Sequence, residues 1–341
     1  MSTKISIDLG NLKVKAKTGG VKPLMLPSRF ALLEDVEMVD MKGDKLDLNT
    51  YEINNMVYVW GKDIHKVPAE KCLTTLGYDD RYVGEEFQIM VKIVLAEMLH
   101  KNKVNRNVIV ATGVPSSEMN TILEEQISEA FENDGKPHEI IRNGKSIFIT
   151  VDECHVITQA LGTGYNEYLD QEGFIANDEM EEIKIGIIDI GGGTTDCDLI
   201  YNLRHQKNPF SIDRGMFSIY EGIATQINKD RPKVKVTPEE IEDCFKKEVY
   251  TVKKGDDINF TTIKIKLLEK LARDIITDIN RKWKKKEQLS FIFLTGGGAS
   301  VMAEYIAEDF DNILVVENSE WANCYGFYAF LMNLVDETDG E

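Results

Sequence analysis

Cysteine is scarce in this chain, and its few copies form no recognisable pattern. The 341 residues include five cysteines, and no two of them stand in C-x-x-C spacing. No cluster of histidine and cysteine has the spacing of metal ligands, so neither a disulfide framework nor a structural zinc site is expected. Unpaired cysteines are typical of proteins in a reducing cytoplasm. We expect Cys197 to be a small buried residue.

Long apolar segments are also missing. No run in the sequence approaches the roughly 20 residues that a membrane-spanning helix needs. The first strand-like segment begins within a few residues of Met1, which leaves no room for a signal peptide. The sequence therefore predicts a cytoplasmic protein that does not attach to membranes.

Positive charge is in deficit. Lysine and arginine number 40 against 58 aspartates and glutamates, which gives a formal net charge of -18. Direct binding to DNA or RNA is not expected from such a chain. The basic segment Arg281 to Lys286 is the main exception. It is either a solvated helix end, where cations suit the helix dipole, or a contact patch for an acidic surface, such as that of another copy.

What the chain does contain is a glycine turn after a strand-like segment, at Lys184 to Asp198 (KIGIIDIGGGTTDCD). An apolar run ends at Asp189, and Gly191, Gly192, Gly193, Thr194 and Thr195 follow. Backbone N–H groups of such a turn, with threonine hydroxyls beside them, can hold phosphate oxygens, and a carboxylate at the strand end suits hydrated magnesium. The spacing fits neither the P-loop nor the Rossmann motif. The alternative is a glycine-rich hairpin without a ligand.

Two further segments repeat this pattern. Lys4 to Lys13 (KISIDLGNLK) places Asp8, Gly10 and Asn11 after a strand, about half a chain away from the first copy. That separation is what an internal duplication would produce. A third glycine turn lies in Phe291 to Ser300 (FIFLTGGGAS). Three such turns favour a common ligand over three unrelated loops.

Hydrophobic periodicity predicts strands alternating with helices in both halves, so the fold class is α/β with mixed sheets. Two halves with matching turns would face each other across a cleft that holds a nucleotide. The chain contains 43% hydrophobic residues and is long enough for two or more domains. Among the expected elements are strands at Tyr51–Trp60 and Ser146–Val151 and a helix at Gly84–Leu99. We also expect a helix capped by Ser116 or Ser117, a helix that follows Asp152 and Glu153, and an acidic linker at Glu167–Glu182.

The order of these motifs resembles the actin, sugar-kinase and Hsp70 ATPase superfamily, and most of all the bacterial actin-like plasmid-segregation proteins of the ParM type. The resemblance implies an actin-like fold with two related α/β domains that flank a nucleotide cleft. Domain I would span 1–165, with an inserted subdomain at about 20–100. Domain II would span 166–341, with an insertion at about 220–270 and a helix at about 321–335 that returns to domain I.

The resemblance also implies a role for each motif. Asp8 and Asp189 would hold Mg²⁺, and Glu153 and Asp189 would be the catalytic residues. Glu153 has Asp152 as a competitor, because the proline usual before this glutamate is missing. The remaining nucleotide ligands implied by the resemblance are Gly10, Asn11, Lys13, Gly191, Gly192, Gly193, Thr194 and Thr195 for the phosphates, and Gly296, Gly297, Gly298 and Ala299, after Thr295, for adenosine. A second connecting motif falls on Asn323 and Gly326.

The function implied by the resemblance is an ATPase that polymerises with ATP and disassembles after hydrolysis. Such a filament would move plasmid DNA through an adaptor protein bound to the plasmid's centromere DNA. Two alternatives stay open, a small-molecule kinase of the same superfamily and a cell-shape actin homologue. A peptide-binding chaperone is not expected, because the chain ends soon after the last nucleotide motif. The choice between ATP and GTP also stays open.

Overall fold

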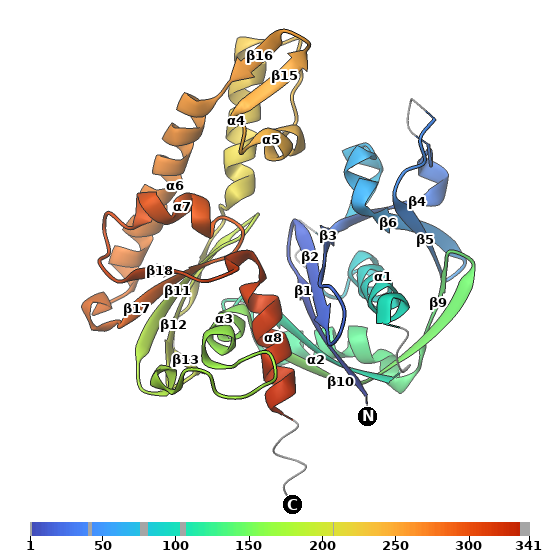
Figure 1. Cartoon of the computed structure of the whole chain (residues 1–341), viewed down its shortest axis with the longest axis horizontal. Coiled ribbons are helices and arrows are strands. Elements are labelled where there is room, and N and C mark those ends of the chain that lie inside the picture. The colour runs from blue at the N-terminus through green and yellow to red at the C-terminus, as the bar shows by residue number, and fades with distance from the viewer. Residues whose placement is uncertain (1, 40–42, 76–80, 103–106, 207, 335–341) are drawn as a thin grey trace, which may run out of the picture. The chain divides into compact units, whose positions relative to one another are not determined.

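The structure is a computed structural model, and it describes residues 2–39, 43–75, 81–102, 107–206 and 208–334 (Figure 1). The chain forms two compact units. Unit 1 comprises Met1–Asp178 and Trp321–Glu341, and unit 2 comprises Glu179–Glu320. The expected domain boundary at 165 lies inside helix α3 (Gln159–Tyr168), which belongs to unit 1. Helix α8 (Ala322–Asn333) also belongs to unit 1, while Val335, the expected end of this helix, lies outside the described residues.

Unit 1 is built on a ten-stranded sheet that curls around helix α1 (Glu85–Asn102) (Figure 1). In spatial order the strands are β3 (Leu24–Pro27), β2 (Lys13–Thr18), β1 (Thr3–Leu9), β8 (Asn107–Val114), β10 (Lys145–Thr158), β9 (His138–Arg142), β5 (Leu48–Ile53), β6 (Met56–Gly61), β4 (Arg29–Leu32) and β7 (Cys72–Thr74). β1, β8 and β10 run parallel, and the other neighbours pair antiparallel.

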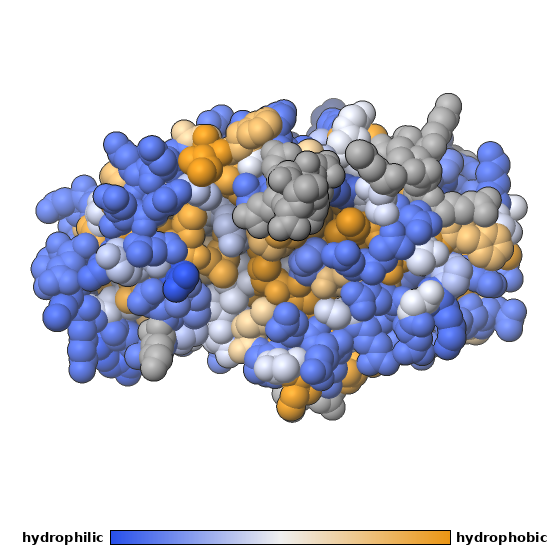
Figure 2. Space-filling view, turned by 90° about the horizontal axis from the view of Figure 1, so that it is seen from below, coloured by the Kyte–Doolittle hydropathy of each residue, from blue (hydrophilic) through white to orange (hydrophobic). Residues whose placement is uncertain are grey.

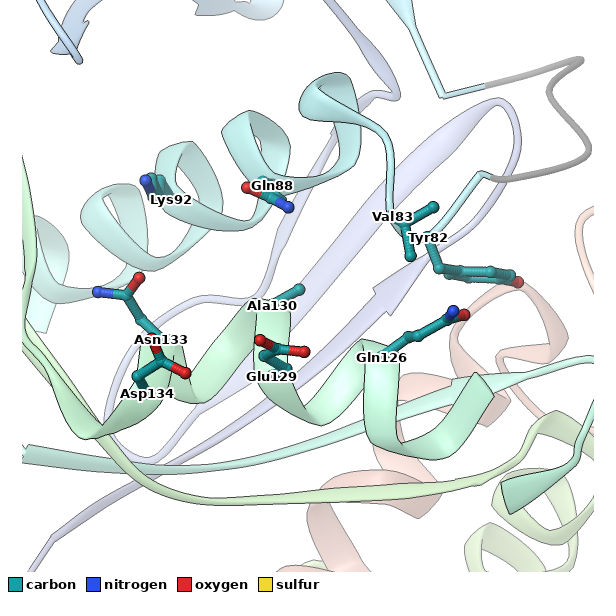
Figure 3. A pocket seen from close by; sticks show the side chains of 9 residues that line it. All are labelled: Tyr82, Val83, Gln88, Lys92, Gln126, Glu129, Ala130, Asn133 and Asp134. Carbon is teal, nitrogen blue, oxygen red and sulfur yellow. The ribbon is translucent and has the colours of Figure 1, made fainter. Parts of the chain in front are cut away.

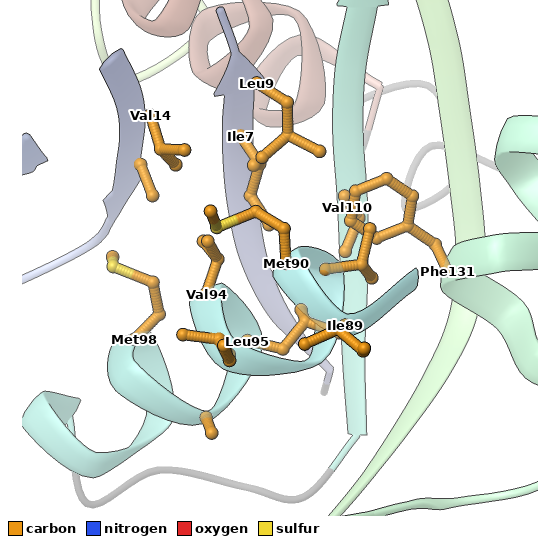
Figure 4. Close-up of a cluster of buried hydrophobic side chains, with 14 of the residues drawn as sticks. Ile7, Leu9, Val14, Ile89, Met90, Val94, Leu95, Met98, Val110 and Phe131 are labelled. Atoms are coloured by element: carbon orange, nitrogen blue, oxygen red, sulfur yellow. The ribbon is translucent and has the colours of Figure 1, made fainter. Parts of the chain in front are cut away.

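Helix α1 is buried on nearly every side. Met90, Val94 and Met98, which lie along one face at helical spacing, are buried, and so are Ile89 and Ile93 on other faces of the helix. A helix that is apolar almost all round must be enclosed, and here the curled sheet encloses it. Figure 4 shows its side chains packed against those of β1, β2 and β8. The helix expected at Gly84–Leu99 is confirmed, and it lies within the core of unit 1.

Two sequence-based boundaries in unit 1 are wrong for local reasons. The single strand expected over Tyr51–Trp60 is the hairpin β5–β6, because Asn54 and Asn55 both adopt the left-handed conformation that a two-residue turn needs. Helix α2 (Thr121–Glu132) is capped by Asn120, whose Oδ1 accepts a hydrogen bond from the Leu123 N–H. Ser116 and Ser117 precede the helix without capping it. Both errors come from asparagines whose usual roles, in a tight turn and at a helix N-cap, were overlooked in the sequence.

Unit 2 contains a six-stranded sheet with its helices and a separate hairpin. The sheet strands are β13 (Arg204–His205), β12 (Thr195–Tyr201), β11 (Lys184–Ile190), β17 (Phe291–Thr295) and β18 (Ile313–Val315), with β14 (Phe210–Ile212) paired to β12. The helices are α4 (Met216–Asp230), α5 (Pro238–Cys244), α6 (Thr261–Lys282) and α7 (Ala299–Ile306), and the hairpin is β15 (Val249–Lys253) with β16 (Asp256–Asn259). Short 3-10 helices in the two units are η1 (Leu33–Asp35), η2 (Lys62–Lys66), η3 (Ala69–Lys71), η4 (Asn133–Gly135), η5 (Asp178–Glu181), η6 (Lys286–Gln288) and η7 (Ser319–Trp321).

The two units share one arrangement of strands. In unit 1, β1 pairs antiparallel with β2 and parallel with β8. In unit 2, β11 pairs antiparallel with β12 and parallel with β17. The tight turn of each hairpin carries one of the predicted glycine motifs. The α/β class with mixed sheets is confirmed, and the repeated hairpin is the structural form of the sequence repeat.

The basic segment at the end of α6 is anchored by an aromatic residue. The helix ends at Lys282, and Trp283 at its C-cap is buried against Gly186 and Phe210. The Lys282 ammonium lies 4.1 Å from the centre of the Phe210 ring. Arg281 and Lys282 therefore lie in the last turn of α6, where cations interact favourably with the helix dipole, as expected if the basic segment is a solvated helix end.

The surface shown in Figure 2 is mostly hydrophilic, and its hydrophobic residues are scattered in small groups. The most exposed large hydrophobic side chains are Ile122 and Phe174, at 68% and 61%. Among the helices of the described residues, none combines the length and the hydropathy of a transmembrane span. Together with a net charge of -18, the surface disfavours direct contact with nucleic acid phosphates.

Candidate functional site

The first hairpin places a carboxylate, a lysine and an amide together. Asp8, near the end of β1, is only 2% exposed. Lys15 stands opposite it on β2, and its Nζ lies 3.0 Å from Asp8 Oδ2. Gln159, the first residue of α3, donates a hydrogen bond from Nε2 to Asp8 Oδ1 across 3.4 Å. Both carboxylate oxygens of Asp8 therefore have partners from β2 and α3.

The lysine beside Asp8 is not the one that the sequence indicated. Lys13 and Lys15 are two residues apart on β2, so they lie on the same face and the sequence pattern cannot choose between them. The register decides, because it pairs Asp8 with Lys15 and Lys13 with Pro27. Lys15 is the residue that the sequence reasoning missed, while a phosphate contact by Lys13 stays a prediction.

The turn of this hairpin requires glycine. A Cβ at Gly10 would lie 2.8 Å from the backbone oxygen of Lys13, which is too close for any other residue. Asn11 follows in the turn, and both residues are half-buried. The backbone of Gly10 and Asn11 can therefore approach a ligand, as the sequence analysis expected.

Glu153 does not lie where the sequence analysis placed it. Strand β10 does not end at Val151; it continues through a bulge to Thr158, and Glu153 lies inside it. The register aligns Glu153 with Ile109 of β8, and Ile109 with Lys4 of β1. Asp8 is four residues further along β1, roughly 13 Å in the strand direction. The side chain of Glu153 is 63% exposed and pairs with His155 Nε2 at 3.3 Å.

Asp152, the competitor, is equally far from the hairpin turn. Its two oxygens accept hydrogen bonds from the Ser2 hydroxyl and the Asn107 amide. The strand–helix junction is instead at Thr158 and Gln159, which the register places level with the end of β1. The sequence signal for this junction was Thr158, whose hydroxyl caps α3 by accepting the Leu161 N–H.

Helix α3 is fixed tightly to α8, so Gln159 stands on a rigid element. A Cβ at Gly326 would lie 1.7 Å from the backbone oxygen of Gly162, and a Cβ at Gly162 would lie 2.4 Å from the Phe327 ring. The Thr163 hydroxyl donates to Asn323 Oδ1 at 2.8 Å. The backbones of α3 and α8 therefore approach closely, and Asn323 and Gly326 of the second connecting motif make that contact.

The second hairpin holds the triple-glycine turn against a helix. The Gly191 N–H donates to the Thr194 oxygen at 2.9 Å and closes the turn between β11 and β12. At the start of α4, the N–H groups of Met216 and Phe217 donate to the oxygens of Gly191 and Gly192 at 3.0 and 2.8 Å. The turn residues 191–194 are half-buried. This turn is braced from behind by α4, while its residues stay partly accessible.

The threonines of this turn have different roles. The Thr194 hydroxyl donates to Asp196 Oδ2 at 2.9 Å, next to the turn. The Thr195 hydroxyl donates to the Arg214 backbone oxygen at 2.8 Å, and Thr195 is fully buried. Thr195 therefore holds the hairpin to the segment before α4, and Thr194 remains the threonine at the turn surface.

Asp189 and the third glycine turn lie together in unit 2. Asp189 is 8% exposed and pairs in register with Thr295 of β17. Gly296 has a φ of +83°, and a Cβ there would lie 2.3 Å from Asp189 Oδ1. The Gly298 N–H donates to the Ile190 oxygen at 2.9 Å. The structure thus brings the predicted magnesium and adenosine motifs into contact, and the positive φ and the close approach at Gly296 require glycine there.

The donors on these hairpins fit a magnesium nucleotide. In the described part of the chain, no three or more His, Cys, Asp or Glu side chains converge to hold a metal ion. Hydrated Mg²⁺ does not need such a cluster, since it is usually held by one or two carboxylates and substrate phosphates. Asp8 and Asp189 are buried carboxylates beside glycine turns, and both suit that role. Cys197, the predicted small buried residue, is fully buried, and burial holds the pKa of its thiol well above the ordinary value.

Comparisons with known proteins assign both halves of the chain to one kind of fold. Residues 6–162 match the model of the actin like proteins N terminal domain, and residues 187–308 match the C-terminal model of the archaeal actin homologue MreB-like family. No curated protein matches the sequence.

Solved structures agree over nearly the whole chain. The apo psk41 ParM protein is 22% identical, covers 100% of this chain and 99% of its own, and has a TM-score of 0.75. A 15-stranded ParM filament from Clostridium botulinum is 21% identical, with coverages of 96% and 98% and a TM-score of 0.75. An archaeal actin homolog in complex with ADP is 16% identical, with the same coverages and a TM-score of 0.77. The predicted actin-like fold is confirmed.

Proposed function

Because both halves of this chain match family models of actin-like proteins, we propose that it is an ATPase whose nucleotide state controls assembly into filaments. The observation that carries the proposal is the repeated hairpin, which in each unit has a buried aspartate near the end of its first strand and a glycine turn beyond it. The relatives support it, since one is an ADP complex of an actin homolog and another is a ParM filament.

In the proposed reaction each unit supplies groups for the nucleotide. Asp8 and Asp189 are the carboxylates that would hold Mg²⁺, which would supply charge neutralisation for the phosphates. The turn of the first hairpin, with Gly10, Asn11 and Lys13, and the turn at 191–194 bind phosphate oxygens, while the buried Thr195 holds the second turn in place. Gly296, Gly297, Gly298 and Ala299 line the adenosine side. The Lys15 ammonium, 3.0 Å from Asp8 Oδ2, holds the Asp8 side chain in place.

We assign the positioning of the attacking water to Gln159 instead of Glu153. Gln159 is at the junction that Glu153 was expected to occupy, and its amide already contacts Asp8. An amide can orient water through hydrogen bonds, but it cannot take a proton at neutral pH. Hydrolysis that depends on a glutamine should therefore show no titration of the positioning residue between about pH 5 and 8.

The biological role that we propose is the movement of plasmid DNA through an adaptor protein bound to centromere DNA. Two named relatives are ParM proteins, which supports this choice. A net charge of -18 disfavours direct DNA contact and agrees with an adaptor. The five free cysteines fit a cytoplasmic setting.

One experiment tests the proposal against its rivals. Purified protein is mixed with Mg²⁺ and ATP, and light scattering and phosphate release are followed together. Scattering that rises with ATP and decays as phosphate accumulates supports a filament-forming ATPase. Phosphate transfer to a sugar or an organic acid without assembly would identify a small-molecule kinase. Replacing ATP with GTP in the same assay determines the nucleotide preference.

A further inference from the structure

Arg81, which belongs to none of the motifs found in the sequence, contacts the turn of the first hairpin. Arg81 precedes helix α1, 70 residues from Asn11 in the chain. Its Nη1 donates to Asn11 Oδ1 at 2.7 Å, and its Nη2 donates to the backbone oxygen of Leu9 at 2.5 Å. The guanidinium is therefore hydrogen-bonded to the turn for which we propose phosphate binding.

The charge of Arg81 has no anionic partner within the described residues. Its two hydrogen-bond acceptors, a side-chain amide and a backbone carbonyl, are both neutral. Its Nε is buried without a hydrogen-bond partner. Lys15 differs, because its charge is matched by Asp8 on the same hairpin. A half-buried cation with neutral partners is stabilised when an anion joins it.

Neighbouring aromatic and polar groups hold Arg81 in this position. The guanidinium lies 5.2 Å from the centre of the Tyr82 ring. Tyr82 packs edge-on against Phe87 of α1, and its hydroxyl donates to Glu118 Oε2 at 2.9 Å. Tyr82 also lines one end of a polar hollow of about 190 Å³ between α1 and α2 (Figure 3). Arg81 is thus fixed through its neighbour before any ligand binds, which lowers the entropic cost of binding.

We propose that Arg81 binds the terminal phosphate of a nucleoside triphosphate and so makes the site prefer triphosphate over diphosphate. The inference rests on the proposed function. An arginine carries five N–H donors, and the two hydrogen bonds to Asn11 and Leu9 leave others for phosphate oxygens. The planar fork of a guanidinium matches two oxygens of one phosphate group, which a lysine cannot do.

The test compares three variants with the wild type. Arg81→Gln keeps an amide that can still donate to the turn but removes the charge, and Arg81→Lys keeps the charge but removes the fork. Arg273→Gln is the matched control, because Arg273 on α6 is 68% exposed and loses the same charge. Dissociation constants of a non-hydrolysable ATP analogue and of ADP are measured with Mg²⁺, below the concentration at which light scattering detects assembly.

We expect Arg81→Gln to weaken binding of the ATP analogue by about ten- to a hundredfold, as for loss of a charge-assisted hydrogen bond, and to change ADP binding by less than about threefold. Arg81→Lys should lose part of the same preference, and Arg273→Gln none. Equal weakening for both nucleotides would show that Arg81 only supports the hairpin and would overturn the proposal, as would unchanged binding. If Arg81→Gln does not fold, the Arg81→Lys pair of constants decides alone.

If the proposed nucleotide-binding function is wrong, the wild-type protein binds neither nucleotide. That result is obtained before any variant is made, and it also means that Arg81 has no phosphate to bind. When the wild type binds both nucleotides, only the ratio of the two constants in the Arg81 variants bears on this inference.

Discussion

Gln159 and Asp8 are joined by a hydrogen bond from Nε2 to Oδ1 although 151 residues separate them in the chain. The contact ties the start of α3 to the end of β1, and it puts an uncharged side chain where the sequence suggested a glutamate. Because α3 packs against α8 at backbone distance, Gln159 has little freedom to move. We therefore expect the rate of hydrolysis to depend on Gln159.

Replacing Gln159 with alanine should slow phosphate release by roughly a hundredfold, the scale expected when a reacting water is no longer held in position. Assembly with ATP should persist, because nucleotide binding does not require the water. The measurement is phosphate release together with light scattering at saturating ATP. Glu153→Ala is the matched control and should leave the rate unchanged, since Glu153 is exposed and far along β10. Slow phosphate release by the Glu153→Ala variant would instead support Glu153 as the residue that positions the attacking water.

Lys15→Ala should destabilise the folded protein, because it leaves the Asp8 carboxylate buried without its cation. Removing one partner of a buried ion pair costs about 3 kcal/mol or more, and both side chains here are well protected, at 13% and 3% exposed. The free energy of unfolding in urea measures the effect. Lys13→Ala on the same strand should cost less than about 1 kcal/mol. Equal losses in the two variants would contradict the register-based choice of Lys15.

Much of the site could be predicted from the sequence because its glycine turns are local. A strand that ends in aspartate and then glycine identifies a hairpin wherever it occurs, so Asp8, Asp189 and Gly296 were found without the fold. The contact between Asp189 and Gly296 in unit 2 follows from β11 and β17 being parallel neighbours, which a repeated motif suggests but does not prove.

Register and contacts between distant segments could not be predicted in this way. The choice of Lys15 over Lys13 depends on how β1 pairs with β2, and a shift of two residues would reverse it. Glu153 was misplaced because β10 continues through a bulge at 151–153, whereas an Asp-Glu pair after an apolar run resembles a strand end. Arg81 was missed since nothing near it in the sequence points to Asn11.

The contact between α3 and α8 predicts that Gly326→Ala is strongly destabilising. The added Cβ would lie 1.7 Å from the backbone oxygen of Gly162, and backbone cannot move aside as a flexible side chain can. We expect a loss of about 3 kcal/mol or more in the free energy of unfolding, at or above the usual range for overpacking. Gly222→Ala in α4 is the control, because its Cβ meets only the end of the Leu267 side chain. That variant should change stability by less than about 1 kcal/mol, since alanine also favours the helix. Equal effects would show that α3 can move away from α8.

Because His138 is buried, we expect the folded protein to lose stability in mild acid. The side chain is 1% exposed and its Nε2 contacts the Phe131 oxygen at 2.6 Å. Burial lowers the pKa of His138 below its ordinary value of 6.5, and the nearby Lys92 adds to the effect, while the Phe131 hydrogen bond opposes it. The unfolded chain therefore takes up a proton near pH 6.5 that the folded protein does not. Stability from this group is full above that pH and falls as the pH drops toward the lowered pKa. His138→Gln, which keeps an N–H donor for Phe131, should flatten this part of the profile. Urea unfolding of both proteins between about pH 5 and 8 gives the comparison, and parallel profiles would contradict a neutral buried histidine.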